Sequence, residues 1–159
     1  MSMIIDPPKD NESLQTYVED ISLTYFGKPF RHRATFNNRL RTTGGRYHIQ
    51  THDLDFNPTI VNEFSKEVFL GIVKHELCHY HLHLDGKGYQ HRDHDFKQLL
   101  KKVGGRRYTP LTEQAKLNRR QLTYQCTGCG ILVQRQRRIN TKKYVCRNCH
   151  SSFQLVNSK

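Results

Sequence analysis

The feature that most constrains this chain is the pentapeptide His75-Glu76-Leu77-Cys78-His79, set in an apolar, helix-patterned run from Val68 to Leu84. Two histidines four positions apart on a helix project from one face, about 6 Å apart along its axis, so both imidazoles can reach one metal ion. Glu76 lies about 100° around the helix from His75, which puts its carboxylate beside the metal and within reach of a bound water. The pattern predicts a zinc-binding helix whose chemistry is hydrolysis by metal-activated water.

Two histidines alone hold zinc poorly, so the chain has to supply a third ligand. His83 lies on the same helix face, but about 12 Å along the axis from His75, whereas a zinc–nitrogen bond spans only about 2 Å. His91 and His94 follow a glycine-rich turn at which the chain can fold back toward the helix. We favour His91 as the third ligand and keep His94 as the alternative. His81 and His83 are expected to be solvated or to contact the ligands rather than the metal.

A second metal-binding pattern consists of Cys126-x2-Cys129 and Cys146-x2-Cys149. Each pair forms a tight turn that presents two thiolates, and the residues between the pairs suffice for a hairpin that brings both turns around one zinc ion. Four thiolates leave no open position on the metal, so this site is predicted to be a structural zinc ribbon rather than an active site. His150 is expected to be a bystander, and Cys78 a buried core residue.

Charge is divided unevenly along the chain. Residues 1–96 carry 11 Lys and Arg against 13 Asp and Glu, whereas residues 97–159 carry 15 against 1. A basic segment interleaved with tyrosine and phenylalanine is typical of a protein that binds a phosphate backbone. The predicted hairpin tip, Gln134 to Lys143, is the best candidate surface. Charge alone does not separate DNA, RNA and acidic proteins, and of these we expect DNA.

The periodicity of apolar residues predicts an α+β catalytic domain followed by a small β module. Helices are expected over Leu14–Phe26, from a Ser65 cap to about Leu84, and over Phe96–Val103, with a short helical start at Pro58 capped by Asn57. Short strands are expected over Phe30–Phe36, Arg46–Gln50 and Asp53–Asn57, with an edge segment over Arg39–Thr43. The expected domains are residues 1–105, a linker at 106–123, and the four-cysteine ribbon at 124–159.

The composition favours a soluble cytoplasmic protein. No apolar stretch approaches the roughly 18 residues of a membrane span, and Met1 to Asp10 carries two acids and two prolines instead of a charged and then apolar leader. Four of the five cysteines lie in paired metal-ligand spacing, so we expect them to be reduced.

The stretch from about Leu14 to Val103 resembles the SprT-like metalloprotease domain, the family that includes Spartan. The resemblance is carried by four segments: Arg39-Leu40-Arg41-Thr42-Thr43-Gly44-Gly45-Arg46-Tyr47, Asp55-Phe56-Asn57-Pro58, the His75 to His79 motif, and His91-Arg92-Asp93-His94-Asp95-Phe96. It implies a small zincin-like domain, zinc on His75, His79 and a histidine shortly before an aromatic residue, and Glu76 as the catalytic residue. Arg92 is a departure, because the family often has histidine at that position.

The resulting hypothesis is a zinc-dependent metalloendopeptidase with one catalytic and one structural zinc, in which Glu76 takes the proton of the attacking water. Resemblance to Spartan implies protein substrates that are bound or crosslinked to DNA. One alternative is a nucleic-acid-binding regulatory protein whose first zinc site is structural or vestigial. Another is a metal-dependent hydrolase that acts on bonds other than peptide bonds.

Overall fold

The structure is a computed structural model, and it describes residues 6–158. Residues 1–5, part of the segment in which no leader was expected, lie outside the described range. The chain divides into two compact units, with the boundary between Glu113 and Gln114 in the sequence. Among the described residues, no helix has the length and apolar character needed to cross a membrane.

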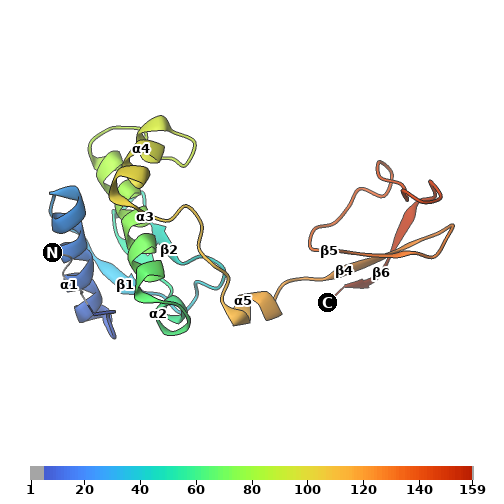
Figure 1. Ribbon diagram of the computed structural model, residues 1–159, viewed down its shortest axis with the longest axis horizontal. Helices are drawn as coiled ribbons and strands as arrows, with labels where there is room; N and C mark the ends of the chain where they lie inside the picture. The colour runs from blue at the N-terminus through green and yellow to red at the C-terminus, as the bar shows by residue number, and fades with distance from the viewer. Residues whose placement is uncertain (1–5, 159) are drawn as a thin grey trace. The chain divides into compact units, whose positions relative to one another are not determined.

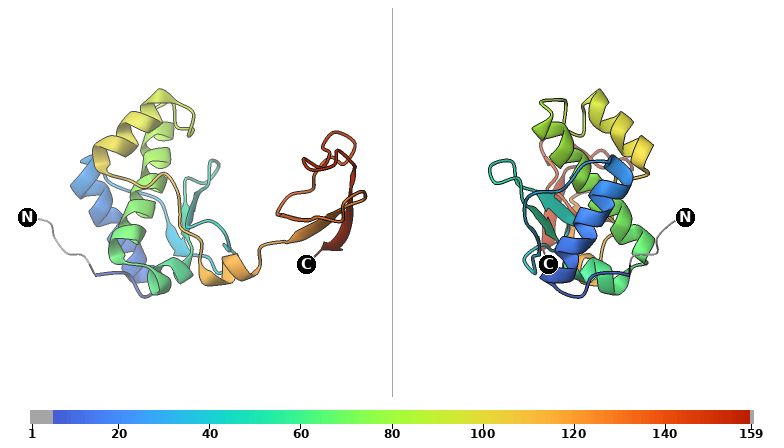
Figure 2. Two further views of the ribbon diagram at one scale, coloured as in Figure 1. Left: turned by 45° about the vertical axis from the view of Figure 1, so that its right-hand side comes forward. Right: turned by 90° about the vertical axis from the view of Figure 1, so that its left-hand side faces the viewer.

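The first unit packs helices on one side of a small sheet (Figures 1 and 2). Its elements are α1 (Asn11–Ile21), the π-helix η1 (Ser22–Phe26), β1 (Ala34–Phe36), β2 (Gly45–Tyr47), β3 (Leu54–Phe56), α2 (Pro58–Glu63), α3 (Lys66–Leu84) and α4 (His94–Val103). The strand order is β1-β3-β2, with β1 parallel and β2 antiparallel to β3. The predicted α+β class is confirmed.

Helix α1 starts at a capping box, in which the Asp10 carboxylate accepts from the Ser13 amide at 2.8 Å and the Ser13 side chain accepts from the Asp10 amide. The predicted helix Leu14–Phe26 is interrupted, because its last five residues form the π-helix. Ser22 begins that turn and is fully buried, with its hydroxyl 2.6 Å from the Lys28 carbonyl. The turn ends at Gly27, whose φ of 65° lies in the left-handed region that glycine tolerates best.

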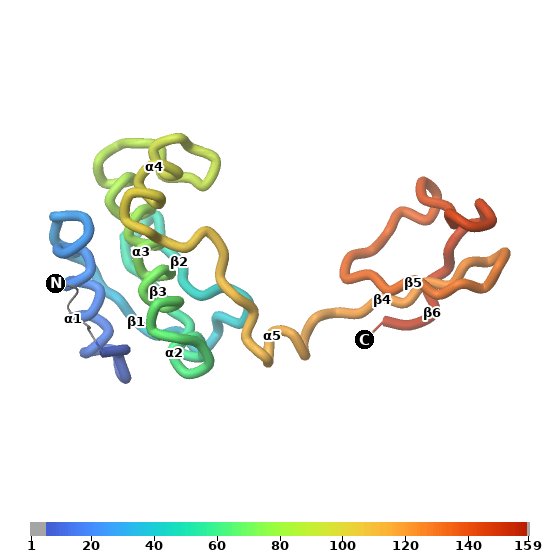
Figure 3. The backbone as a smooth tube through the Cα atoms, in the orientation of Figure 1, coloured from blue at the N-terminus to red at the C-terminus, as the bar shows by residue number. Residues whose placement is uncertain are grey.

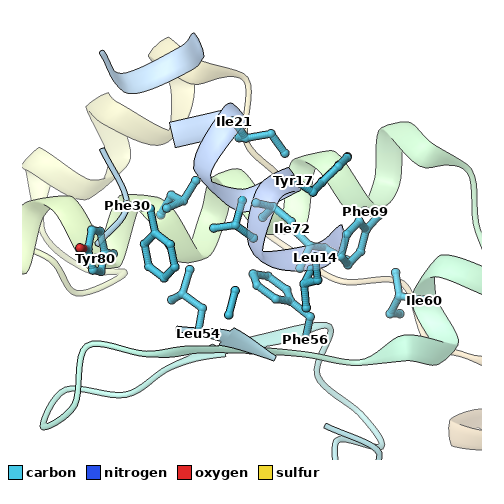
Figure 4. Close-up of a cluster of buried hydrophobic side chains, with 14 residues drawn as sticks. Leu14, Tyr17, Ile21, Phe30, Leu54, Phe56, Ile60, Phe69, Ile72 and Tyr80 are labelled. Carbon is cyan, nitrogen blue, oxygen red and sulfur yellow. The ribbon is translucent and has the colours of Figure 1, made fainter. Parts of the chain in front are cut away.

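Helix α3 is the centre of the first unit and buries more than one face. Toward α1 and the sheet it contributes Phe69, which packs edge-on against Phe56 with ring centroids 5.6 Å apart (Figure 4). On another face, Cys78 and Leu82 pack with residues of α4. Cys78 is fully buried, as expected. Burial on several sides explains how so short a domain can fix this helix, and with it the histidine motif.

The caps of the neighbouring helices only partly match the prediction. The Asn57 side chain accepts from the Thr59 amide at 3.0 Å, so the predicted cap of α2 is confirmed. Ser65 takes the N-cap position of α3 with extended backbone, but its side chain makes no capping hydrogen bond.

Strands β1, β2 and β3 of the first unit are each three residues long, which is shorter than predicted. The prediction of an edge segment over Arg39–Thr43 was wrong, because this stretch forms turns and bends. The Asn37 carbonyl accepts from the Leu40 amide at 3.2 Å, and its side-chain oxygen accepts from the Arg39 amide at 2.9 Å. Asparagine satisfies backbone groups locally in this way, which turns the chain instead of extending it.

The second unit is a three-stranded antiparallel sheet with strand order β5-β4-β6, built from β4 (Leu122–Cys126), β5 (Leu132–Arg135) and β6 (Phe153–Ser158). Its buried side chains include Leu122 and Tyr124 on β4. Within the predicted linker 106–123 the structure places a short helix, α5 (Glu113–Leu117), and the first residues of β4. Gln134 and Arg135, expected at the hairpin tip, pair with β4, so the connection begins after them.

Candidate active site and metal centres

Three histidine side chains converge at the middle of the first unit. His75 and His79 lie one turn apart on α3, and His91 lies in the loop between α3 and α4. Figure 3 shows the course of this loop. The Nε2 atom of His91 is 2.8 Å from that of His75 and 3.0 Å from that of His79, and the two helix nitrogens are 3.2 Å apart. His94 is the exposed first residue of α4 and is not part of this group in the described structure.

The hydrogen bonds of the Nδ1 atoms show which nitrogens of His75 and His79 are free to bind a metal. Nδ1 of His75 is 2.6 Å from the Arg106 carbonyl, and Nδ1 of His79 is 2.6 Å from the Tyr89 carbonyl. A carbonyl only accepts, so both Nδ1 atoms carry the proton and both Nε2 atoms present lone pairs. Lone pairs at these separations repel one another unless a cation lies between them. Tetrahedral zinc with bonds of about 2.0 to 2.1 Å has ligand nitrogens about 3.3 Å apart, so the donor set fits zinc.

Packing holds these rings in place. The ring of Phe96, on α4, is fully buried and lies 4.4 Å from the His79 ring in a stacked arrangement. It also lies 5.2 Å from the His75 ring and 5.1 Å from the His91 ring, both measured between centroids. Burial is the largest cause that lowers the pKa of His75 and of His79, each to about 4, so both imidazoles are neutral at pH 7, as metal ligands have to be.

Glu76 lies next to the three histidines and is buried. Burial raises its pKa to about 8. A carboxyl group whose pKa lies near neutral pH can both take up and release a proton during catalysis. Strand β2 passes so near that a Cβ added to Gly45 would lie 2.8 Å from the Cγ atom of Glu76, so glycine makes room for the carboxylate here. A cleft of about 340 Å³ is lined by Glu76, the three histidines and β2.

A cluster of one tyrosine and two further histidines beside the cleft was not predicted from the sequence. The Tyr47 ring is parallel to that of His79, with centroids 6.5 Å apart, and its hydroxyl is 2.6 Å from Nδ1 of both His52 and His83. Burial is the main cause that raises the pKa of Tyr47 to about 12, so its hydroxyl keeps its proton. His83 was placed on the same helix face as His75 and was expected to be solvated or to contact the ligands, but its tyrosine partner follows only from the folding of β2 onto α3.

His81, which was expected to be solvated or near the ligands, belongs to the packing behind the site. It is buried, with Nε2 2.8 Å from the Ser22 hydroxyl and its ring 5.0 Å from that of Phe26. Burial is the largest cause that lowers its pKa, to about 4. His81 therefore joins η1 to α3 as a neutral side chain and does not face the cleft.

The second unit brings its four cysteines together as a group. Their sulfurs all lie within 4.8 Å of one another, with 3.3 Å between Cys126 and Cys149 and 3.7 Å between Cys129 and Cys146. These separations are too long for disulfides, whose sulfurs are about 2.05 Å apart. Zinc–sulfur bonds of about 2.3 Å in a tetrahedron separate the sulfurs by about 3.8 Å, so the four residues can hold a metal ion of this kind.

The two cysteine turns share one backbone design. The amide of Gly130 donates to the Cys126 carbonyl at 3.1 Å, and the amide of His150 donates to the Cys146 carbonyl at 2.8 Å. Both residues have left-handed backbone, with φ of 74° for Gly130 and 59° for His150. His150 thus takes the position that glycine takes in the first turn, and the metal group of the described residues does not include it.

Known proteins resemble this chain over most of its length. The SprT-like family model matches residues 14–121. A "Protein SprT-like" from Enterococcus faecalis is 57% identical over 88% of this chain and 91% of its own length, and one from Geobacillus kaustophilus is 54% identical over 92% and 99%. A third, from Lactiplantibacillus plantarum, is 50% identical over 90% and 97%. No solved structure matches. With a family model over most of the chain and relatives this similar along nearly their whole length, this chain belongs to the SprT-like family.

Proposed function

We propose that the protein is a zinc-dependent metalloendopeptidase. The observation that carries this proposal is the convergence of three imidazole nitrogens beside a buried carboxylate, at the edge of a cleft. Three protein ligands leave one position for water or substrate, which is the arrangement of catalytic rather than structural zinc sites. His75, His79 and His91 would hold this zinc, and the four cysteines would hold a second, structural one.

In the proposed reaction, zinc held by His75, His79 and His91 would act as a Lewis acid that polarises the peptide carbonyl and acidifies the attacking water. Glu76 accepts the proton of that water and later delivers it to the nitrogen of the leaving amine. The carbonyls of Arg106 and Tyr89 keep Nδ1 of the two helix histidines protonated, which leaves their Nε2 atoms available for the metal. Phe96 fixes the orientation of the rings.

The first test compares Glu76→Gln with Glu67→Gln, a matched change at an exposed position on the same helix. Loss of a general base lowers rates by about two to four orders of magnitude, so Glu76→Gln is expected to abolish most peptide hydrolysis and retain zinc, while Glu67→Gln behaves as wild type. Zinc content and cleavage of an unfolded protein are measured side by side. Equal activity of wild type and Glu76→Gln would refute the proposal.

The third ligand is tested by comparing His91→Ala with His94→Ala. His91→Ala is expected to lower the zinc content from about two to about one per chain and to leave the ribbon zinc in place. His94→Ala should keep both. The opposite result would assign the ligand to His94.

We further propose that the substrates are nucleic-acid-associated or DNA-crosslinked proteins in the cytoplasm. The support is the charge of residues 97–159, with 15 basic against 1 acidic side chain, together with the likeness to Spartan. In the second unit Arg137, Arg138, Lys142 and Lys143 are all exposed on the connection that follows β5. The ribbon would then recruit nucleic acid, and the first unit would cut the protein attached to it.

Salt titration of DNA and RNA binding tests this part. Changing Arg135, Arg137 and Arg138 to alanine together is expected to weaken binding equally across sequences. The slope of log affinity against log salt should become shallower, by about 0.7 to 0.9 for each phosphate that the variant no longer neutralises. Alanines at Arg31, Arg33 and Arg39 in the first unit serve as the control. Unchanged slopes would direct the search to acidic protein partners.

The alternative function, a nucleic-acid-binding regulator with a non-catalytic first site, has the same basic ribbon in its favour. It predicts that Glu76→Gln changes neither hydrolysis nor nucleic-acid binding. The cleft at the histidines favours the enzyme, because a purely structural site has no use for an opening.

A further inference from the structure

Zinc would polarise the peptide carbonyl, but no side chain has yet been assigned that would donate a hydrogen bond to the substrate as charge develops on it. When water adds to a peptide carbonyl, the oxygen–carbon bond forms and an electron pair moves onto the carbonyl oxygen, so negative charge collects there. Enzymes stabilise this charge with hydrogen-bond donors or cations held at that point. The following inference rests on the proposed function and concerns which residue does this.

The chain that leaves α4 is fixed directly behind the histidines. The amide of Arg106 donates to the Gly71 carbonyl on α3 at 3.0 Å, and its own carbonyl accepts from His75. The Arg106 side chain lies where a Cβ of residue 71 would be, so it is packed against the helix. With Arg106 held at both backbone groups, the next residue, Arg107, has to lie at the edge of the site.

Arg107 and the site residues surround one small cavity. This cavity, of about 150 Å³, is lined by Arg107, Glu76, His75 and His91, together with β2 and Thr109. Its volume corresponds to a few water molecules, so it suits a single polar group rather than a side chain of any size. Arg107 therefore lines the same small space as Glu76 and two of the proposed ligands.

Two other donors at the cleft already have partners. The guanidinium of Arg46 bonds to the Asp55 carboxylate at 2.8 Å. The hydroxyl of Tyr47 has only one proton, and two imidazoles hold that hydroxyl at 2.6 Å. No ion pair involves Arg107 within residues 6–158, where its guanidinium lies over the ring of Tyr108, 5.5 Å from the centroid. Its side chain is exposed and carries donors that substrate can use.

We propose that Arg107 is a catalytic residue, whose guanidinium donates hydrogen bonds to the carbonyl oxygen of the scissile peptide as water adds. Arg107 gives up no proton. Glu76 takes the water proton, the carbon–nitrogen bond breaks as the electron pair on oxygen returns to carbon, and the amine leaves with the proton from Glu76. Arg107 stabilises the oxygen only while it carries the negative charge.

Kinetics of Arg107→Ala give the first test. A donor of this kind contributes about 10²- to 10³-fold to kcat, so the variant is expected to lose that much in kcat with little change in KM and unchanged zinc content. Arg107→Lys should recover part of the rate, because it restores the charge without the planar fork. Arg33→Ala removes the same charge from an exposed position that lines neither the cleft nor the small cavity. This variant should have the kinetics of wild type. An effect confined to KM would overturn the proposal.

Binding measurements test the same residue without turnover. A phosphinic peptide, in which a charged tetrahedral PO₂–CH₂ group replaces the scissile amide, is compared by calorimetry with the uncharged amide peptide of the same sequence. Both peptides are measured in the Glu76→Gln background, so that the amide peptide is not cleaved. Arg107→Ala should weaken binding of the phosphinic peptide by more than tenfold and leave binding of the amide peptide unchanged. Equal losses, or no loss, would overturn the role of Arg107. If the proposed function itself were wrong, the result would be different, because wild type and Glu76→Gln would then show the same hydrolysis.

Discussion

The two candidate metal centres are built on opposite physical principles. The histidine centre of the first unit rests on a core in which α1, α3 and the sheet bury large side chains such as Phe56 and Phe69. The cysteine centre of the second unit has little beneath it, and apolar side chains such as Leu132, Tyr144 and Val145 are about half exposed or more, at 60%, 56% and 51%. The comparison predicts that the first unit can fold without its proposed metal, whereas the second needs a bound metal to fold.

Removal of the metal should produce the largest difference in stability between the two units. Structural zinc contributes about 10 to 16 kcal/mol of binding free energy to small modules, far more than the apolar contacts around Leu122 and Tyr124 can replace. A strong chelator added to the full chain is therefore expected to unfold the second unit and leave the first folded. Amide hydrogen exchange, read separately for residues 6–113 and 114–158, measures this. Equal protection of both units after chelation would break the comparison.

Phe96→Ala tests whether the core of the first unit supports its metal centre. Truncating a fully buried phenylalanine costs about 3 to 5 kcal/mol, and here it also removes the surface against which all three histidine rings pack. We expect lower stability of the first unit and weaker zinc binding there, with the ribbon unaffected. Thermal unfolding and competition with a zinc chelator would measure both. Phe153→Ala, on the ribbon strand β6, is the control.

Acid should act on the first unit in part through His81. This imidazole is buried beside Lys28 and Asp85, and its pKa of about 4 lies below the ordinary value of 6.5. Above pH 6.5 both the folded and the unfolded forms are neutral, so there is no effect. Between pH 6.5 and 4 only the unfolded form takes up a proton, which destabilises the fold by an amount on the order of 3 kcal/mol.

The matched variant is His81→Gln, which keeps a polar partner for Ser22 but does not titrate in this range. Its free energy of unfolding, measured in urea from pH 7.5 to 4, should fall less steeply than that of wild type. Parallel curves would show that other groups cause the acid sensitivity of the first unit.

The smallest effect concerns the two cysteine turns. Gly130→Ala puts a Cβ into left-handed backbone and is expected to destabilise the ribbon by about 1 to 2 kcal/mol, whereas His150→Gly should stabilise it slightly or leave it unchanged. Zinc competition on both variants measures the difference. Loss of metal in His150→Gly would mean that the imidazole, and not only the backbone, serves the site.

Much of this molecule could be predicted because its signals are periodic or paired. The apolar period of α3, the asparagine cap of α2 and the two cysteine pairs each depend on residues close in sequence. The groups that orient the histidines could not be found in this way, because the carbonyls of Arg106 and Tyr89 are backbone groups that every residue has. The prediction of an edge segment over Arg39–Thr43 was wrong because the side chain of Asn37 competes with strand pairing.

The loop between α3 and α4 has a consequence for exchange of the metal. It supplies one proposed ligand, His91, and two positions earlier the carbonyl that holds His79. An ion leaving the site would have to wait for this loop to swing away, which breaks contacts at two of the three imidazoles at once. Dissociation of the ion should then follow the opening rate of the loop, so the lifetime of the bound metal is set by a short stretch of chain rather than by the strength of any one bond.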